Sequence, residues 1–397
     1  MVPPDTLQLR DLDRALPQFH EQQTASRPLS RRSTPPPEGA EPNPSALQQL
    51  HRLNRSSPNF DNQLSDVLYG KEYVQCVPTL QGNDLAWLVD YLDEALDRLN
   101  PSGPASRKCL RELRSICGAR VILPTSYTLS PHSLNVDSDP FASGGYGDTY
   151  HGILNGARIC VKRVYIQDGP RETVKRFYQE AVMWKRSTHP NIVPFLGVTV
   201  APPQLVSNRM SGRTLLQYVG KRPDSDRPRV LYDVAKGLHY LHSHNVIHGG
   251  IKGANILVDG SGRACITDFG EATVVKDEDF VEDNSDTFGY TPRWAAPEVL
   301  VGGAFSKEAD IFSFAMVMIE VFTGAVMFSD KPILGAMSAV VQGERPPRPA
   351  HRAFTDNLWT LMQRCWDHDP SLRPQASEVL EILAMSVPRS FQQSYIR

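Results

Sequence analysis

The sequence lacks most of the features that mark specialised classes of protein. Its 42 Lys and Arg residues nearly balance its 44 Asp and Glu residues, so the formal net charge is only −2. Without a surplus of either charge, nucleic acid and anionic membranes are not expected as the main partners. The chain also has no apolar run of the roughly 18 residues that a membrane span needs, and its first residues lack the apolar core of a secretory signal.

Cysteine is scarce, and its spacing gives no reason to expect a metal. The six cysteines in 397 residues include no Cys-x-x-Cys pair. The sequence therefore predicts neither a zinc site nor a disulfide framework. Reduced thiols of this kind are typical of a cytoplasmic protein, with the nucleus as the alternative location.

Residues 1–58 are rich in Pro, Ser, Gln and Arg and include Ser-Thr-Pro-Pro-Pro at 33–37. Such a segment cannot bury enough apolar surface to offset the entropy that is lost on ordering. We therefore predict a disordered tail there, either purely solvated or carrying a phosphorylation site or docking motif. A second, short tail is predicted at 387–397.

Residues 59–126 change to helical periodicity. Apolar residues recur at steps of three and four over residues 85–99, which predicts an amphipathic helix. A second helix is predicted over 106–117, with Gly118 as its stop signal, and an earlier one around 62–75. This helical extension either binds a partner or regulates its neighbour, or it simply packs on the adjacent domain. The packing interpretation is favoured.

The remaining chain contains strands followed by helices. Apolar, β-branched runs at 157–164 and 192–200 precede segments with helical periodicity. Those segments cover residues 230–243, 307–323, 356–367 and 375–385. Strands first and helices after them indicate the α+β class, here arranged in two lobes.

Two motifs in the strand-rich part suit phosphate binding. The segment Ala-Ser-Gly-Gly-Tyr-Gly-Asp-Thr-Tyr-His-Gly at 142–152 is rich in glycine, which lets a backbone approach phosphates without obstruction. Lys162 ends a β-branched run, where its ammonium can pair with phosphate oxygens and with a carboxylate. Glu180, in a predicted helix over 171–187, is the candidate carboxylate. Taken alone, the glycines could form an ordinary turn, and Lys162 and Glu180 could be solvated surface charges.

Two further motifs carry groups that suit magnesium. Asn255 lies in Val-Ile-His-Gly-Gly-Ile-Lys-Gly-Ala-Asn-Ile-Leu-Val at 246–258, and Asp268 begins the Asp-Phe-Gly that follows. An Asn and an Asp on neighbouring short strands can together ligate Mg²⁺, which prefers oxygen donors. Beyond them stand Thr-Pro-Arg-Trp-Ala-Ala-Pro-Glu at 291–298, then Asp310 and Arg373.

In this order the motifs resemble a eukaryotic protein kinase domain over residues 130–386, with an N-lobe at 130–206 and a C-lobe at 211–386. Lys252, two places after the family's catalytic aspartate, resembles the loops of Ser/Thr kinases. The stretches His-Pro-Asn-Ile-Val-Pro-Phe-Leu-Gly-Val, Leu-Val-Ser-Asn-Arg-Met and Arg-Trp-Ala-Ala-Pro-Glu are similar to tyrosine-kinase-like Ser/Thr kinases. The helical extension and the glycine segment together resemble the expanded kinase families of basidiomycete fungi.

The resemblance implies ATP and Mg²⁺ as ligands. Lys162 would hold the α- and β-phosphates, clamped by Glu180, while Asn255 and Asp268 would hold the magnesium ion. The residues implied to bind nucleotide are Ala142, Gly144, Gly147, Thr149, Cys160, Lys162, Glu180, Ser207, Asn208, Met210 and Leu257.

Within that set, Ser207 is implied to be the gatekeeper, and the backbone of residues 208–210 to face the adenine edge. Cys160 and Leu257 would sandwich the adenine ring. The resemblance also implies three structural residues, Glu298, Asp310 and Arg373. Of these, Glu298 and Arg373 would form a buried ion pair.

The pattern fails in the catalytic loop. Where the family has His-Arg-Asp, this chain has His248, Gly249 and Gly250. The family's aspartate orients the substrate hydroxyl and accepts its proton, and glycine can do neither. Losing general-base assistance costs roughly 10²–10⁴-fold in rate. Lys252 remains as the catalytic side chain of this loop. Glu271 is either a compensating acid or a solvated loop residue, and the solvated interpretation is favoured.

Other departures concern regulation and affinity. The family's arginine at the position of Gly249 pairs with an activation-loop phosphate, so that form of control is not expected here. The candidate phosphorylation sites in the activation loop are nevertheless Ser285, Thr287 and Thr291. Ala142 replaces the first loop glycine and Thr149 replaces a valine above adenine, and both should weaken nucleotide binding modestly.

Two functions are compatible with these residues. In the first, the chain is a pseudokinase that binds ATP and Mg²⁺ and acts in signalling or as a scaffold for protein partners. In the second, it is a residually active Ser/Thr kinase that transfers the γ-phosphate of ATP to protein hydroxyls. Gly250 beside an otherwise retained set of residues favours the first. The sequence leaves open whether the chain is an enzyme.

Overall fold

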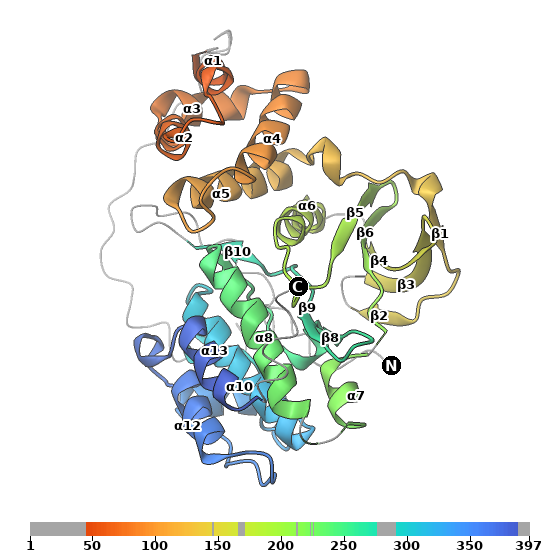
Figure 1. Ribbon diagram of the computed structural model, residues 1–397, viewed down its shortest axis with the longest axis vertical. Coiled ribbons are helices and arrows are strands. Elements are labelled where there is room, and N and C mark those ends of the chain that lie inside the picture. The colour runs from red at the N-terminus through yellow and green to blue at the C-terminus, as the bar shows by residue number, and fades with distance from the viewer. Residues whose placement is uncertain are drawn as a thin grey trace.

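The computed structural model describes residues 45–144, 147–165, 171–211, 213–222, 224, 226–275 and 291–387. The candidate phosphorylation sites Ser285 and Thr287 lie outside these residues, as do 1–44 and 388–397. The described residues form a helical extension, a lobe built on a β-sheet and a mostly helical lobe (Figure 1). The two-lobed α+β arrangement predicted from the sequence is confirmed.

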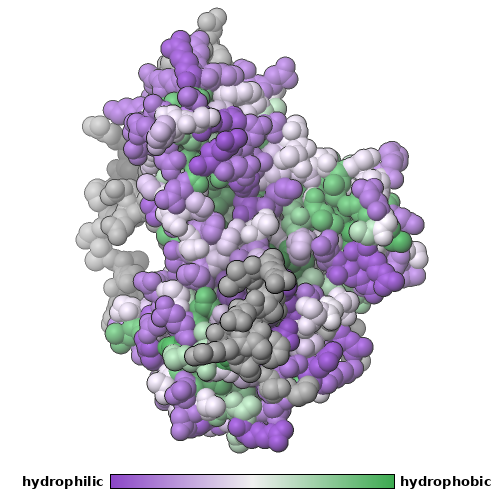
Figure 2. Space-filling view, in the orientation of Figure 1, coloured by the Kyte–Doolittle hydropathy of each residue, from purple (hydrophilic) through white to green (hydrophobic). Residues whose placement is uncertain are grey.

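The extension is a small helical bundle at one end of the molecule. Its helices are α1 (Ser45–Arg52), α2 (Phe60–Tyr69), α3 (Lys71–Cys76), α4 (Gly82–Leu96) and α5 (Pro104–Arg120), with 3₁₀ turns η2 (Val77–Thr79) and η3 (Thr125–Tyr127). Leu88, Leu92 and Leu113 have no exposed surface. Because the apolar stripes of α4 and α5 face inward, the visible surface of the extension is mostly hydrophilic (Figure 2).

Helix α1 corrects the last part, residues 45–58, of the disordered tail predicted over residues 1–58; residues 1–44 lie outside the described residues. Ala46 and Leu50, one helical turn apart, are 2% and 0% exposed, and α1 packs on α2 and α3. The polar composition of the whole segment concealed this short apolar pattern at its end. Tertiary packing supplies the stability that a helix of this length lacks on its own.

The N-lobe holds an antiparallel sheet and one long helix. Its elements are η4 (Pro131–Ser133), β1 (Leu134–Val136), β2 (Ala142–Gly144), β3 (Gly147–Leu154), β4 (Ala157–Val164), α6 (Arg171–Lys185), β5 (Phe195–Val200) and β6 (Pro203–Asn208). The strand order is β1-β3-β4-β6-β5, with β2 paired to β3. Helix α6 lies between this sheet and α5 of the extension (Figure 1).

The register of the sheet decides which side chains share a face. Thr149 pairs with Lys162, and Cys160 pairs with Ser207. Directly opposed residues in antiparallel strands point to the same side, and residues two apart along a strand do so as well. All four side chains therefore lie on one face. The residues between them form a separate apolar cluster on the opposite face, comprising Tyr150, Ile159, Val161 and Val206.

The C-lobe is mostly helical. Its helices are α7 (Leu215–Val219), α8 (Asp226–Ser243), η5 (Gly253–Asn255), α9 (Pro297–Leu300), α10 (Lys307–Thr323), α11 (Ile333–Val341), α12 (Asp356–Cys365), η7 (Pro370–Leu372) and α13 (Ala376–Met385). Two small antiparallel sheets pair β7 (Val246–Ile247) with β10 (Thr273–Val274) and β8 (Ile256–Val258) with β9 (Ala264–Ile266). The four helical segments predicted from periodicity correspond to α8, α10, α12 and α13.

Helix α10 forms the centre of this lobe. Every residue from Ala309 to Phe322 is buried, and the helix packs against α7, α8 and α12. A helix that is surrounded in this way is expected to be mostly apolar, and the buried polar exceptions in α10 are Asp310, Ser313 and Glu320. Among the described residues, no helix combines the length and the apolar character that crossing a bilayer requires.

Helix α5 continues past the predicted stop at Gly118. It ends at Arg120, where Val121 adopts a left-handed conformation (φ 56°) and donates its amide to the carbonyl of Cys117. Gly118 lies inside the helix, where an added Cβ atom would come within 2.8 Å of Cγ of Gln179 on α6. The glycine therefore permits close packing of two helices, and its interpretation as a stop signal is wrong.

A buried ion pair joins distant parts of the C-lobe. Arg373 donates to both carboxylate oxygens of Glu298, at 2.7 and 2.8 Å, and to the carbonyls of Glu308 and Asp367. The Arg373 side chain has no exposed surface. An unpaired charge at this depth would be strongly destabilising, so the segment before α13 is tied to the start of α9.

We predict that Arg373→Met lowers the free energy of unfolding by about 3–5 kcal/mol, because it leaves Glu298 without its partner. The matched control is Arg364→Met. Arg364 pairs with Glu378 at the surface, with both side chains more than 40% exposed, and its loss should cost less than about 1 kcal/mol. Urea unfolding of both variants measures the difference. Equal costs would contradict the structural role of the Arg373 pair.

Candidate functional site

Lys162 occupies the centre of the site, where three elements meet. It projects from β4, and its Nζ lies 2.9 Å from Oε1 of Glu180 on α6 and 2.9 Å from Oδ1 of Asp268, just after β9. Glu180 is buried, whereas the Asp268 side chain is 40% exposed. The structure thus brings together the three charged residues that the sequence singled out separately.

Electrostatics fixes the charge state of this triangle. Burial lowers the pKa of Lys162, but the Asp268 and Glu180 carboxylates outweigh it and hold that pKa above its ordinary value. Burial raises the pKa of Asp268, but Lys162 more than compensates and brings it down to about 2. Burial also raises the pKa of Glu180, which the Lys162 ammonium opposes. At neutral pH, Lys162 is protonated and Asp268 is ionised.

Asn255 and Asp268 come together through the pairing of β8 with β9. The strands align Ile256 with Ile266, and the Thr267 amide donates to the carbonyl of Asn255 at 2.9 Å. Asp268 is therefore offset from Asn255 by one residue across the pair. The Asn255 side-chain amide donates to the carbonyl of Gly250 at 2.9 Å, which leaves its oxygen available. No group of three or more His, Cys, Asp or Glu residues suited to a metal occurs in the described chain.

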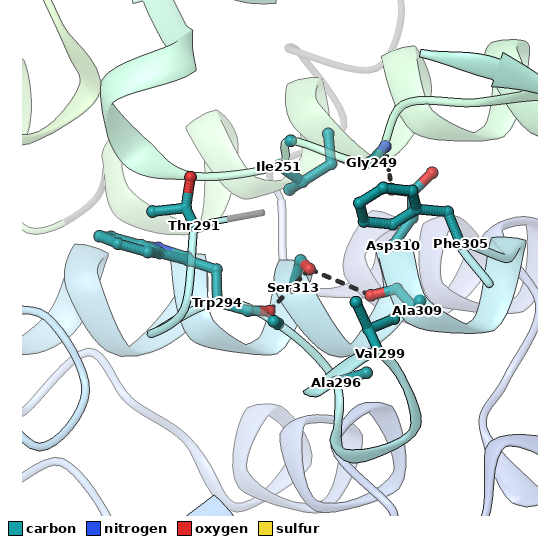
Figure 3. Close-up of a pocket in the computed structure, with 12 residues that line it drawn as sticks. Gly249, Ile251, Thr291, Trp294, Ala296, Val299, Phe305, Ala309, Asp310 and Ser313 are labelled. Carbon is teal, nitrogen blue, oxygen red and sulfur yellow. Dashed lines mark hydrogen bonds between the residues drawn. The ribbon is translucent and has the colours of Figure 1, made fainter. Parts of the chain in front are cut away.

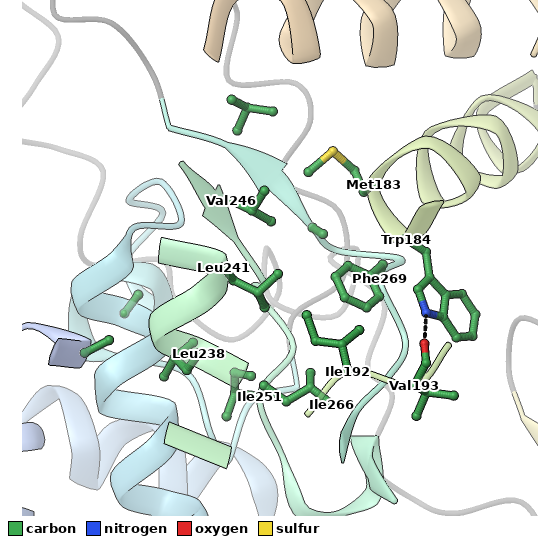
Figure 4. Close-up of a cluster of buried hydrophobic side chains, with 14 of the residues drawn as sticks. Met183, Trp184, Ile192, Val193, Leu238, Leu241, Val246, Ile251, Ile266 and Phe269 are labelled. Carbon is green, nitrogen blue, oxygen red and sulfur yellow. Dashed lines mark hydrogen bonds between the residues drawn. The ribbon is translucent and has the colours of Figure 1, made fainter. Parts of the chain in front are cut away.

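A column of rings connects α6 with the catalytic loop. Trp184 of α6 stacks on Phe269 at 5.9 Å between centroids, and Phe269 meets His248 edge-on at 5.1 Å. Figure 4 shows Met183 and Trp184 at the end of α6, in the same buried cluster as Phe269. Trp184 is itself fixed by a hydrogen bond from Nε1 to the carbonyl of Val193 at 2.8 Å. The position of α6 and the position of the loop are thus mechanically linked.

Asp310 of α10 accepts hydrogen bonds from two backbone amides of the catalytic loop. Its Oδ2 accepts the His248 amide at 2.8 Å, and its Oδ1 accepts the Gly249 amide at 2.9 Å (Figure 3). Oδ2 also lies 3.0 Å from Nε2 of His242. These contacts use backbone amides of the loop, so they do not depend on the two side chains that Gly249 and Gly250 lack.

The two glycines differ in what their positions would tolerate. Gly249 has φ 72°, and a Cβ atom there would come within 2.8 Å of the backbone oxygen of Glu271. At Gly250, a Cβ atom would find only ordinary contacts, at 3.5 Å from Asn255 and 3.6 Å from His248. A Cβ atom at position 250 therefore fits the present backbone, whereas one at 249 is strained.

Both glycines line a small pocket with Thr291, Trp294 and Asp310 (Figure 3). Its volume of about 10 Å³ corresponds to roughly one water molecule.

Lys252 and Thr291 connect the catalytic loop to the segment before α9. Lys252 Nζ donates to Thr291 Oγ1 at 3.0 Å. A second link runs through Glu320 of α10, which accepts the Gly253 amide and Nε1 of Trp294, both at 2.8 Å. Burial raises the pKa of Glu320 to about 7, against the effect of these two donors. The sequence reasoning missed Glu320, although an acidic residue in the apolar run of α10 was a usable signal.

Glu271 is not the solvated loop residue that the sequence favoured. Its side chain is 20% exposed, and its carboxylate lies 3.9 Å from Nη1 of Arg176 on α6. Burial raises the pKa of Glu271 to about 8, with Arg176 opposing the shift. The Glu271 side chain therefore lies against α6. Its neighbour Arg176 was not identified from the sequence.

The residues expected at the adenine edge lie at the end of β6 and just after it. Ser207 is buried on the same sheet face as Lys162. The amides of Asn208 and Arg209 donate to the carbonyls of Pro194 and Arg158. The Met210 amide donates to no other residue among those the structure describes. Leu257, expected opposite Cys160, is half-buried on β8.

Gly144 and Gly147 of the glycine segment have different surroundings. A Cβ atom on Gly144 would touch only the Gly147 oxygen, at 3.8 Å. A Cβ atom on Gly147 would overlap the carbonyl oxygen of Arg163 on β4. Gly144 is therefore open to an approaching group, while Gly147 is required by strand packing. Ala142 pairs with Thr149 at the base of the same hairpin.

Comparison with known proteins gives a consistent picture. A family model described as protein tyrosine and serine/threonine kinase matches residues 138–383. Serine/threonine-protein kinase STY17 of Arabidopsis thaliana is 31% identical over 251 residues, which cover 61% of this chain and 43% of that protein. Serine/threonine/tyrosine-protein kinase HT1 of the same plant is 31% identical over 255 residues, covering 61% and 64%.

A relative from another lineage is the probable serine/threonine-protein kinase drkD of Dictyostelium discoideum. It is 33% identical over 248 residues, which cover 60% of this chain and 19% of that protein. The chain spans less than two thirds of the length of each of these relatives. The similarity is therefore one of domains.

We predict opposite effects of alanine at the two loop glycines. Gly249→Ala should cost about 1–2 kcal/mol of stability, because a left-handed residue with a Cβ is strained and the atom meets a backbone oxygen. Gly250→Ala should be neutral or stabilising by up to about 1 kcal/mol, since it reduces the entropy of the unfolded chain. Urea unfolding of the two variants tests this, and a larger cost at 250 than at 249 would contradict it.

Proposed function

Because the chain belongs to the protein tyrosine and serine/threonine kinase family and has a kinase domain of the tyrosine-kinase-like Ser/Thr type, we propose that it is a pseudokinase. In this proposal it binds ATP with Mg²⁺, transfers phosphate poorly or not at all, and acts through protein partners. The observation that carries the proposal is Gly250 beside the intact triangle of Lys162, Glu180 and Asp268.

Three features support nucleotide binding. The Lys162 ammonium is held in place by two carboxylates, as a group that grips phosphate oxygens must be. Thr149, Cys160 and Ser207 share its face of the sheet and so form a continuous wall above that ammonium. The Met210 amide, which has no partner among the described residues, can donate to the edge of a base.

The donor set also fits magnesium. Asn255 offers an amide oxygen and Asp268 an ionised carboxylate, and both follow directly from the pairing of β8 with β9. Mg²⁺ is commonly bound by one or two such oxygens together with substrate phosphates and water. One ammonium between two carboxylates leaves the site short of positive charge, which favours binding of a divalent cation. When bound, the ion would neutralise charge that develops on the phosphates.

The impairment follows from what surrounds Gly250. No side chain at this position can align a substrate hydroxyl or take its proton. Asp268 is engaged by Lys162. Glu271 faces Arg176, and because burial raises its pKa to about 8 it is mostly protonated at neutral pH and is not a ready base. General-base assistance is worth roughly 10²–10⁴-fold, or about 3–5 kcal/mol of barrier. Positioning of the nucleotide, which supplies much of phosphoryl transfer, is unaffected.

A second function is favoured by one contact. Lys252 still donates to Thr291 across the place where a substrate hydroxyl would enter. A residually active Ser/Thr kinase could use this lysine to stabilise the charge on the transferred phosphate, while the hydroxyl proton leaves to phosphate or water. This is the alternative that the experiments below separate from the first.

We predict that Mg²⁺-ATP stabilises the protein. At 100 times its dissociation constant, the nucleotide should add about 2.7 kcal/mol to the free energy of unfolding, seen as a rise in melting temperature. Lys162→Met should abolish this increment. Lys331→Met is the matched control, because Lys331 pairs with Glu344 at the surface, and it should keep the full increment. No shift of the parent protein at saturating Mg²⁺-ATP would remove nucleotide binding from the proposal.

We predict that Gly250→Asp restores phosphoryl transfer. The position accepts a Cβ atom without strain, so we expect the substitution to leave the backbone of the loop in place. Incorporation of radiolabelled phosphate into a generic Ser/Thr substrate should rise by about 10²–10⁴-fold. Gly250→Asn controls for size without basicity and should remain as inactive as the parent. Equal turnover by the parent and Gly250→Asp would reject the pseudokinase proposal in favour of the residual kinase.

A further inference from the structure

The extension contacts α6 at Gln179, one residue before Glu180. Gly118 of α5 lies so close to Gln179 that a Cβ atom would reach Cγ of Gln179 at 2.8 Å. Gln179 is 6% exposed and precedes Glu180, which pairs with Lys162. The contact between α5 and α6 at Gln179 therefore lies next in sequence to Glu180, the partner of Lys162.

A second anchor holds the end of α6. Arg186, just after the helix, reaches Asp93 at 3.3 Å and Asp97 at 2.7 Å, both from α4 and the turn that ends it. Asp93 is 8% exposed and also accepts the Tyr127 hydroxyl at 2.6 Å. Burial raises the pKa of Asp93, and the Tyr127 hydrogen bond and Arg186 oppose the shift. A buried carboxylate with these partners resists separation from Arg186.

The other end of the extension rests on the C-lobe. The Ser102 hydroxyl donates to the carbonyl of Ser243 at the end of α8, at 2.8 Å. The Asn245 side chain donates to the carbonyl of Pro101 at 3.4 Å, and its backbone carbonyl accepts the Val275 amide just after β10. Helix α5 also packs on β10. The loop between α4 and α5 is therefore fixed to the lobe that carries Asp268.

The extension is tied to the sheet as well. The Leu129 amide donates to the carbonyl of Val198 on β5 at 2.7 Å, and Thr128 forms a parallel bridge with Val198. The extension thus touches the sheet, α6 and the C-lobe, the three parts that supply Lys162, Glu180 and Asp268. Movement of α6 away from Lys162 would have to break the Gly118 and Asp93 contacts.

We propose that the helical extension is a built-in brace, in which Gly118 and Asp93 act as positioning residues that keep α6 in the place where Glu180 meets Lys162 and nucleotide can bind. The proposal rests on the proposed nucleotide binding for its affinity readout, but not for its structural one. It differs from packing for stability alone, because it predicts a loss of nucleotide affinity that exceeds any loss of fold.

The magnitude follows from population arithmetic. If a weakened brace leaves only about a tenth of molecules with α6 in place, the apparent dissociation constant for Mg²⁺-ATP rises about tenfold. The fraction of time that α6 is open rises correspondingly, so amide exchange in α6 speeds up while exchange in α10 stays unchanged.

The test uses the full chain with two independent variants. Asp93→Asn keeps the shape and the acceptor for Tyr127 but removes the charge facing Arg186. Gly118→Leu inserts a side chain between α5 and α6. Matched controls are Glu94→Gln, next to Asp93 but pairing with Arg55 at the surface, and Ala119→Leu, next to Gly118 and exposed. Calorimetric titration with Mg²⁺-ATP measures affinity, and hydrogen exchange without nucleotide measures the mobility of α6.

The brace predicts a roughly tenfold larger dissociation constant for Mg²⁺-ATP in both variants. It also predicts faster amide hydrogen exchange in residues 171–185 of both, with neither change in the controls. Adding Gln179→Ala to Gly118→Leu should restore both, since it reopens the space. Unchanged affinity in Asp93→Asn and in a folded Gly118→Leu would overturn the proposal, as would tighter binding, which would indicate an inhibitory extension. If Gly118→Leu fails to fold, Asp93→Asn decides alone.

The two proposals fail separately in this experiment. If the parent protein does not bind Mg²⁺-ATP, nucleotide binding is rejected, and hydrogen exchange of α6 in the variants still decides the brace. If the parent binds and all variants bind equally, the brace is rejected while nucleotide binding stands.

Discussion

The buried carboxylate of Asp310 fixes the backbone of the catalytic loop through two hydrogen bonds. Asp310 is 1% exposed and accepts the amides of His248 and Gly249 while lying against His242. A charge at this depth is stable only with such partners, because its desolvation is costly otherwise. Since the bonds go to backbone amides, the course of the loop is independent of the side chains at 249 and 250. This is how the chain can lack two catalytic-loop side chains and still present Lys252 and Asn255 in order.

Much of the architecture was predictable because several kinds of pattern agreed. The 3.6-residue periodicity predicted α8, α10, α12 and α13, and the order of the motifs predicted two lobes and the family. Short-range signals were less dependable. Gly118 is the residue type that commonly ends a helix, yet here it permits close packing against Gln179. The neighbouring sequence does not distinguish these two roles of glycine. Helix α1 was concealed by the polar residues around it. The burial of Glu271 depends on α6 lying above it, which no local pattern encodes.

The candidate site shows the same division. The residue types at Lys162, Glu180 and Asp268 indicated which chemistry was present. Their meeting at 2.9 Å depends on how α6 sits on the sheet and on how the lobes are joined. The sequence favoured an extension that merely packs on its neighbour. The structure shows that it does pack, with its helices against α6 and the loop between α4 and α5 against the end of α8.

Gly147 has a consequence for how glycine segments are interpreted. Its strand runs so close to β4 that any side chain would overlap the Arg163 carbonyl. A glycine is therefore required here for folding, even in a related protein that no longer binds a nucleotide. Gly144, unlike Gly147, is exposed and has room for a side chain, so folding does not require a glycine there. A survey that scores such segments for ligand binding should weight the open position and discount the packed one.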